Sequence, residues 1–386
     1  MGVLDPLNHC FRGGHAVADV GQESDAVKQS EEDAQETRQS EEEDEKVVEL
    51  QALPDRLMVI LMPNPKEAVH DVFVLKPGDR FHADPEFYLT VTDAIEPHPL
   101  LVFSIKHTAG DFFRGCRPNP CLGLGRHRQI VEVQCQREYE GKGAYPNYIA
   151  RGVTEGLPEV PEPFGLSRWK DSPLYAGLWT WSRGGGWFGP YLKSEFWPEL
   201  NARVLAAWQA DPQRGEEEIF EQVCEDHYGL DAASRAAFRR LCLAAEEAVW
   251  LGRSISEVAR IKDFREADSA RLWMRDDRIG GLDQLAGIFQ ELDAAGLLDE
   301  SLATKRRAAG LFADLCVLAG SVTFRDPTHT AALRASCEYG RRLFAWIACG
   351  WELMIRRLRS GEIPDPTDYL RLRGDFCEFV ATDPLA

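Results

Sequence analysis

Hydrophobic positions in the first half of the chain fall in short runs separated by polar loops. Because continuous apolar runs are typical of strands buried in a parallel sheet, five of them predict strands. These runs cover residues 57–62, 72–75, 100–105, 129–135 and 174–181. A helix is predicted over 85–95, since Asp84 and Pro85 suit a helix start, and a short one over 148–154. Strands alternating with loops and helices predict a parallel α/β sheet of roughly four or five strands.

Beyond residue 198 the hydrophobic positions follow a helical period. Ile219, Phe220 and Val223 lie on one face of a predicted helix, behind three glutamates at its start, where the helix dipole favours negative charge. Asp231 predicts the cap of the next helix. Further helices are predicted over 282–295, 302–319 and 329–359. Residues 191–386 are therefore predicted to form an all-α carboxyl-terminal domain.

The amino-terminal segment differs in composition from the rest of the chain. Residues 1–46 hold 13 acidic and 4 basic side chains, and the 386 residues carry a formal net charge of −19. Such a segment has too little apolar area to offset the entropy of ordering it. Three domains are therefore predicted: a disordered acidic tail over 1–47, a sheet-containing domain over 48–190 and the helical domain over 191–386.

Composition also excludes several classes of function. An acidic chain without a basic face is a poor binder of nucleic acid, so we expect no such partner. The 10 cysteines lack metal-ligand spacing and the glycines at 184–186 lack a nucleotide-binding fingerprint, so we expect no metal and no cofactor. Neither an apolar segment near Met1 nor an apolar run long enough to span a bilayer is present. We therefore expect no membrane partner and a cytoplasmic location.

Charged side chains follow the third and fourth predicted strands. Lys106, His107 and Asp111 come after the third strand, and Arg137 and Glu138 come after the fourth. Because the carboxyl ends of parallel strands meet at one edge of a sheet, we expect these side chains to form a site. Paired carboxylates there suit the activation of a water molecule, and hydrolysis of a glycosidic bond is the commonest reaction built on them.

Basic and aromatic residues near these strand ends indicate the substrate. The cations predicted to make the mouth of the site positive are Lys106, Arg114, Arg126, His127, Arg128, Arg137 and Lys142. A positive mouth suits an anionic substrate such as a carboxylate-bearing sugar. Trp187 is predicted to stack on a sugar ring, whereas Tyr145 and Asn147 are predicted either to line a sugar subsite or to pack a glycine-rich loop. The predicted substrate-binding residues are Lys106, His107, Arg114, Arg137, Tyr145, Asn147 and Trp187.

Two blocks in this region resemble a known enzyme family. FSIKHTAGDFF contains Lys106 and Asp111, and IVEVQCQREYEGKG contains Glu132, Gln134 and Glu138. Together they resemble the catalytic core of the α-glucuronidases of glycoside hydrolase family 67. The later stretch GGGWFGPYL is similar to the segment where the barrel of that family ends and its helical domain begins.

The resemblance implies a fold, a reaction and residue roles. The implied fold is an incomplete (β/α)8 barrel followed by a helical domain, since the family's earlier barrel strands and its general acid have no matching motif here. The implied reaction is the inverting hydrolysis of an α-glucuronosyl or related oligosaccharide, as in xylan degradation. Asp111 and Glu138 would activate the attacking water, and Lys106 would contact the substrate.

Two other hypotheses stay open. One is a non-catalytic carbohydrate-binding protein that keeps part of the barrel without its general acid. The other is an adaptor whose helical domain binds another protein and whose acidic tail serves as a docking segment. We also expect the helical domain to mediate homodimerisation.

Overall fold

The computed structural model describes thirteen segments of the chain: residues 58–61, 69–70, 73–74, 83–110, 112–114, 116–135, 140–159, 165–181, 192, 194–261, 273–274, 282–382 and 384–385. The predicted acidic tail lies outside these residues. From Val59 onward the described residues belong to one compact unit. The division into three domains therefore stays a prediction.

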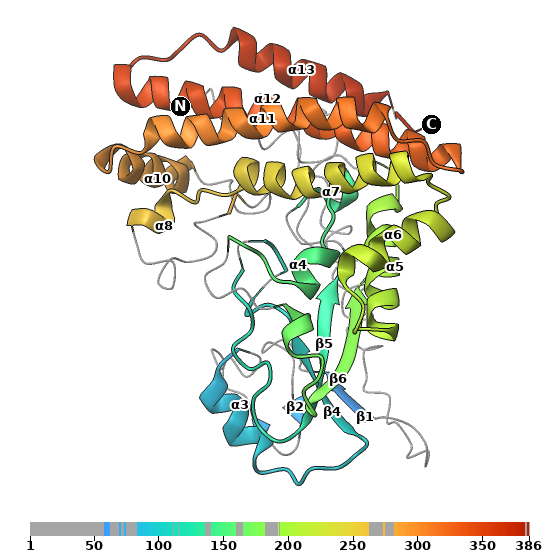
Figure 1. Ribbon diagram of the computed structural model, residues 1–386. Helices are drawn as coiled ribbons and strands as arrows, with labels where there is room; N and C mark the ends of the chain where they lie inside the picture. Colours follow the sequence, from blue (N-terminus) through green and yellow to red (C-terminus); the bar gives the residue numbers. More distant parts are fainter. Residues whose placement is uncertain are drawn as a thin grey trace, which may run out of the picture. The chain divides into compact units, whose positions relative to one another are not determined.

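A four-stranded sheet that contains three parallel strands lies at the centre of the first half of the chain (Figure 1). Its strands, in spatial order, are β1 (Met58–Leu61), β4 (Leu101–Lys106), β5 (Arg128–Gln134) and β6 (Tyr175–Trp181). Strand β5 pairs in parallel with both β4 and β6. The strands predicted at these positions are confirmed, and so is a mixed α/β fold that contains a parallel sheet.

The strand predicted over 72–75 is not part of that sheet. There, β2 (Val69–His70) and β3 (Phe73–Val74) pair antiparallel in a separate two-stranded sheet. Only residues 71–72 connect them, whereas parallel neighbours need a crossover of about a dozen residues or more. A local apolar run predicts a strand but does not predict its partner.

Toward the carboxyl ends of its parallel strands, the sheet has one apolar face and one polar face. On the apolar face, Phe103 packs against Tyr88 of α3 (Pro85–Thr92), and Val131 joins the core that includes residues of α4 (Ala150–Thr154) and α5 (Phe196–Ala210). Residues paired across neighbouring strands, and alternate residues along one strand, share a face. By that rule the opposite face carries Ser104, Lys106, Glu132, Gln134 and Trp179.

Short helices and capped turns connect these strands. Asp84 accepts a hydrogen bond from the backbone N–H of Phe87 at 3.1 Å, which confirms the predicted start of α3. A 3-10 turn, η1 (Gly141–Gly143), follows β5, and a second one, η2 (Leu166–Arg168), precedes β6.

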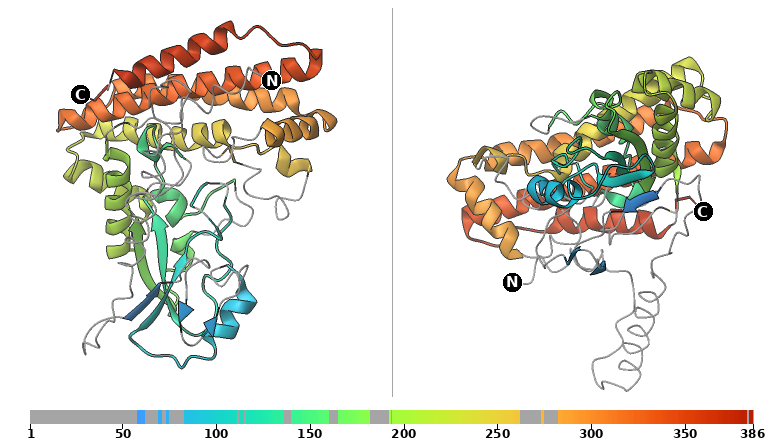
Figure 2. Two further views of the ribbon diagram at one scale, coloured as in Figure 1. Left: turned by 180° about the vertical axis from the view of Figure 1, so that it is seen from behind. Right: turned by 90° about the horizontal axis from the view of Figure 1, so that it is seen from below.

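The second half of the chain is helical. Its helices are α6 (Glu216–Asp226), α7 (Ala232–Arg253), α8 (Val258–Ile261), α10 (Leu282–Ala294), α11 (Leu298–Gly320), α12 (Pro327–Ser360) and α13 (Thr367–Ala381). Helix α11 packs against both α7 and α12, and α13 packs on α12 (Figures 1 and 2). Asp231 caps α7 by accepting from Ser234 N at 2.7 Å, as predicted. Helix α13 has no counterpart in the sequence prediction.

Close helix packing in this half depends on two glycines. Phe312 of α11 stacks on Phe344 of α12 with ring centroids 4.3 Å apart. A Cβ atom added at Gly340 would lie 2.2 Å from the Phe312 ring, and one added at Gly252 would lie 2.0 Å from the Phe344 ring. The missing side chains therefore let the aromatic rings fill the space between α7, α11 and α12.

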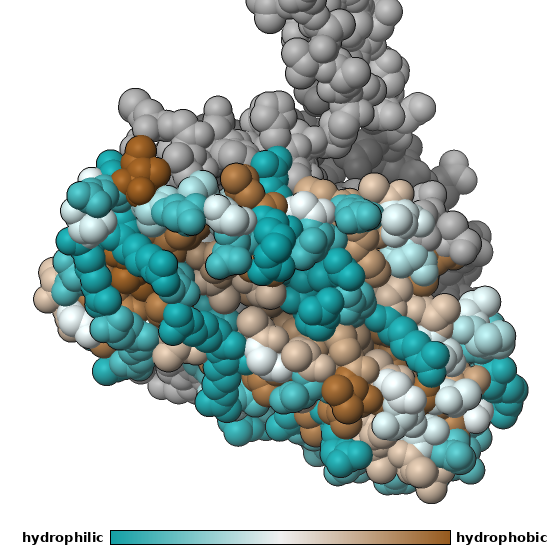
Figure 3. Space-filling view, turned by 90° about the horizontal axis from the view of Figure 1, so that it is seen from above, coloured by the Kyte–Doolittle hydropathy of each residue, from teal (hydrophilic) through white to brown (hydrophobic). Residues whose placement is uncertain are grey.

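The surface seen in Figure 3 is mostly hydrophilic, with hydrophobic residues scattered among polar ones. None of the helices among the described residues combines the length and the apolarity needed to cross a membrane. Homodimerisation through the helical half stays a prediction.

Candidate functional site

The candidate site lies at the carboxyl ends of β4 and β5. Lys106 is the last residue of β4 and is in register with Glu132 on β5. The backbone N–H of His107 donates to the carbonyl of Glu132 at 2.8 Å, so the pairing continues one residue beyond β4. The two strand ends are therefore adjacent, as predicted.

Four of the predicted site residues lie outside the described part of the chain. They are Asp111, Arg137, Glu138 and Trp187. In the sequence, Asp111 comes five residues after the end of β4 and Glu138 comes four residues after the end of β5. Their roles stay predictions. The described residues that flank them in sequence show how the neighbouring segments are arranged.

A buried hydrogen bond joins the segments that follow the two candidate acids. The backbone N–H of Arg114 donates to Oε1 of Glu140 at 2.8 Å. Arg114 comes three residues after Asp111, and Glu140 comes two residues after Glu138. Because Arg114 is 3% exposed and Glu140 is 1% exposed, this charge-assisted bond is shielded from water, and it holds the two loops together.

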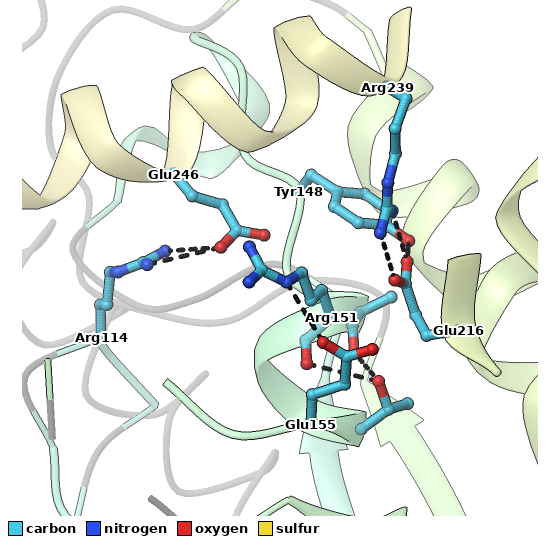
Figure 4. Close-up of polar contacts among 9 residues, drawn as sticks. Arg114, Tyr148, Arg151, Glu155, Glu216, Arg239 and Glu246 are labelled. Atoms are coloured by element: carbon cyan, nitrogen blue, oxygen red, sulfur yellow. Dashed lines mark hydrogen bonds and ion pairs between the residues drawn. The ribbon is translucent and has the colours of Figure 1, made fainter. Parts of the chain in front are cut away.

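The Arg114 side chain anchors these loops to the helical half. Its Nη2 is 2.7 Å from Oε1 of Glu159. Its Nη1 is 3.4 Å from Oε2 of Glu246 on α7, as Figure 4 shows. Burial alone would lower the pKa of this guanidinium, but the charges of Glu246 and Glu159 outweigh burial and raise it. These partners favour a positioning role for Arg114 over the predicted direct contact with substrate.

A row of three side chains crosses the polar face of the sheet. Lys106, Glu132 and Trp179 are in register on β4, β5 and β6. The indole N–H of Trp179 donates to Oγ of Ser104 at 2.8 Å, which fixes the ring orientation. The ammonium of Lys106 lies 4.9 Å from the centroid of the Phe112 ring. A cation, a carboxylate and an aromatic ring side by side suit the recognition of a charged sugar.

Tyr145 packs beneath the glycine-rich loop, which is one of the two alternatives left open by the sequence. Its ring is completely buried, and a Cβ atom added at Gly141 would lie 2.3 Å from it. The ring also meets Phe312 and Phe344 edge-on. Burial raises the pKa of its hydroxyl. Tyr145 therefore joins the loop to the aromatic core of the helical half.

Asn147, the other loop residue with two predicted roles, is held near the end of β5. Asn201 of α5 donates from its Nδ2 to the carbonyls of Asn147 at 2.9 Å and of Cys135 at 2.8 Å. The Asn147 side chain is buried, and its Nδ2 has no hydrogen-bond partner. Of the described residues predicted to bind substrate, Lys106, His107 and Asn147 thus lie near the two strand ends.

A second buried charge cluster fixes the loop from the other side. Both terminal guanidinium nitrogens of Arg239 on α7 donate to Glu216 on α6, at 2.7 and 2.6 Å, and the Tyr148 hydroxyl also donates to Glu216 (Figure 4). Burial, followed by the charge of Glu216, raises the pKa of Tyr148 well above its ordinary value. The loop after β5 is therefore fastened to α5, α6 and α7.

The prediction that Arg126, His127 and Arg128 surround the mouth of the site is wrong. Strand β5 begins at Arg128, so all three lie at its amino end, away from the candidate site. Arg126 donates to the carbonyl of Asp93 at 2.8 Å, and Nε2 of His127 is 2.9 Å from the carbonyl of Thr92. These side chains attach the start of β5 to the end of α3.

The residues that sequence analysis missed are those that hold the site in place. No sequence motif marks these residues, and only their three-dimensional contacts with Arg114 identify Glu140, Glu159 and Glu246. Gln134 was accessible from sequence, since Glu132 and Gln134 alternate with apolar residues along one strand. Within the described ranges, no group of three or more His, Cys, Asp and Glu side chains is arranged to hold a metal ion.

Comparison with known proteins adds no assignment. No protein-family model matches this chain, and no curated protein gives a significant match.

Proposed function

We propose that this protein is an inverting glycoside hydrolase that acts on an oligosaccharide bearing a uronic acid, with an α-glucuronosyl group as the preferred sugar. The observation that carries the proposal is the hydrogen bond from Arg114 N to Glu140. It holds together the loops that contain Asp111 and Glu138, and two carboxylates that act on one water molecule must be close to each other.

The sheet supports the barrel that this function requires. In a doubly wound α/β protein both faces of the parallel sheet are apolar, because helices cover both. Here, at the carboxyl ends of the strands, one face is apolar and the other carries Lys106, Glu132 and Gln134. A sheet that is apolar on its helix side and polar within is what the catalytic end of a (β/α)8 barrel requires. We infer that β1, β4, β5 and β6 form part of such a barrel.

The proposed chemistry is the direct displacement of the leaving sugar by water. Asp111 and Glu138 orient the water and accept its proton, while a general acid protonates the glycosidic oxygen on the other side of the bond. In inverting enzymes the acid and the base are roughly 6.5–9.5 Å apart, which leaves room for the water. Lys106 pairs with the carboxylate of the uronic acid, and Trp179 provides an apolar surface beside the ring.

The test is hydrolysis of a panel of α-glucuronosyl oligosaccharides and matching neutral glucosides by the full-length protein. We expect turnover of the glucuronosides, release of the β-anomer as seen by proton NMR, and a loss of about 10²–10⁴-fold in kcat for Glu138→Gln. Glu155→Gln is the matched control, because Glu155 is an exposed acid just beyond the end of α4 that forms an ion pair with Arg151 on that helix. Equal activity of Glu138→Gln and wild type would refute the assignment.

A non-catalytic carbohydrate-binding protein is the second candidate. The larger sheet formed by the described residues has four strands, half the number of a closed barrel. Binding of an α-glucuronoside without turnover, measured by calorimetry on the same protein, would support this candidate over the hydrolase.

A further inference from the structure

Two glutamines on β5 have opposite environments. Gln129, near the amino end, is completely buried, and its amide nitrogen donates to the Tyr88 hydroxyl at 2.9 Å and to two backbone carbonyls. Its amide oxygen accepts from Gly123 N at 2.9 Å. Gln134, at the carboxyl end, is only 6% exposed, yet its Oε1 has no hydrogen-bond partner.

A buried amide without a partner destabilises a fold, so its presence at this position needs a reason. Gln129, on the same strand, shows that a buried glutamine amide in this sheet can be hydrogen-bonded at both ends. The feature to be explained is the unpaired Oε1 of Gln134. Pairing with a ligand group would remove it.

The surroundings of Gln134 indicate what that ligand group is. Gln134 is two residues beyond Glu132 on the polar face, and Glu132 lies in the row with Lys106 and Trp179. Near the same strand end lies a second buried amide without a partner, that of Asn147. An uncharged amide beside a cation and an aromatic ring is suited to a sugar hydroxyl, which can both donate and accept.

We propose that Gln134 is a specificity-determining residue that binds a hydroxyl group of the uronic acid ring. This inference rests on the proposed function. The amide selects the sugar by its hydroxyl pattern, while Lys106 selects it by charge, so the two residues discriminate against different analogues. A site built to pair a hydroxyl rejects analogues that lack it, because the amide is then left unpaired.

The experiment compares Gln134→Leu with Gln129→Leu, the same substitution on the same strand at the fully hydrogen-bonded position. Binding of methyl α-D-glucuronoside is measured by calorimetry, and thermal unfolding of each full-length variant is measured in parallel. For Gln134→Leu we expect an unchanged or higher Tm and a Kd raised by about tenfold or more. For Gln129→Leu we expect a lower Tm and a Kd that stays within about threefold of wild type.

Three outcomes would overturn the inference. An unchanged Kd for Gln134→Leu would mean that a bound water, not a sugar, satisfies the amide. A fall in Tm as large as that of Gln129→Leu would show that Gln134 has a structural role. If wild-type protein hydrolyses glucuronosides and Gln134→Leu gives either of these two results, the inference about Gln134 fails and the proposed function stands. If wild type neither binds nor hydrolyses any sugar of the panel, the inference and the proposed function both fail.

Discussion

The hydrogen bond between Arg114 N and Glu140 provides the most direct test of how the candidate site is held together. Glu140→Ala removes the acceptor and leaves a buried backbone N–H near the guanidinium of Arg114. An unsatisfied buried donor costs about 1–3 kcal/mol, so the free energy of unfolding should fall by about that amount. Glu140→Gln keeps an oxygen acceptor in the same place and should lose less than half as much.

The same substitution should affect catalysis more than binding. Because the two loops carry Asp111 and Glu138, releasing one from the other displaces the water-activating groups from each other. A displacement of about 1 Å is enough to reduce the rate about 10²-fold. We expect Glu140→Ala to lower kcat for an α-glucuronoside by about 10- to 100-fold with a smaller change in KM, and Glu140→Gln to recover most of the loss.

Urea unfolding and steady-state kinetics on the same preparations measure both effects. Glu155→Ala is the control, since the ion pair of Glu155 with Arg151, at 3.2 Å, is exposed at the carboxyl end of α4 (Figure 4). Its loss should change stability by less than about 0.5 kcal/mol. The reasoning would be refuted if Glu140→Ala unfolded at the same urea concentration as wild type. Equal kinetics of Glu140→Ala and an active wild type would separately refute the positioning role.

Two further predictions concern the helical half. Burial lowers the pKa of Lys305 to about 7, where its Nζ donates to two backbone carbonyls at the end of α7. Above about pH 7 the unfolded state holds this proton and the folded state releases it, so stability due to Lys305 should rise with pH up to about 10. Urea unfolding at about pH 7 and pH 8.5 should show wild type gaining about 1–2 kcal/mol relative to Lys305→Met, and parallel behaviour of the two proteins would contradict the buried charge. Gly340→Ala places a Cβ 2.2 Å from the Phe312 ring and should destabilise the protein by about 1–3 kcal/mol. Gly310→Ala on α11 has no atom within 4 Å of the new Cβ and should stabilise the protein by about 0.5–1 kcal/mol. Thermal unfolding compares the two variants, and equal Tm values would show that α11 and α12 do not pack through Gly340.

Elements defined by local chemistry could be predicted well. Helix α7 begins after Asp231, whose side chain binds Ser234 N as the sequence indicated. Helix α12 ends at Ser360, one residue beyond its predicted end, and the following Gly361 has a φ of 71° that suits glycine. Capping and hydrophobic periodicity act over a few residues, so the sequence carries them directly.

Pairing and orientation could be predicted only in part. The parallel strands β4, β5 and β6 were expected, but the pairing of β2 with β3 was not. The cations Arg126 and His127 were placed at the wrong end of β5, because closeness in sequence to Lys106 does not show which end of the next strand they occupy. The direction of β5 decides at which end they lie. That direction depends on how the connecting segment crosses from β4 to β5, not on the identity of these residues.

The sequence by itself determined which strands and helices form, and it indicated the two strand ends where a site would lie. Only the tertiary structure showed what holds that site: Arg114 meets Glu140 across 26 residues of chain and Glu246 across 132. Such contacts depend on how the helical half packs against the loops, so no local pattern of residue types can encode them. The same is true of Gln134, whose missing partner becomes visible only when its burial is known.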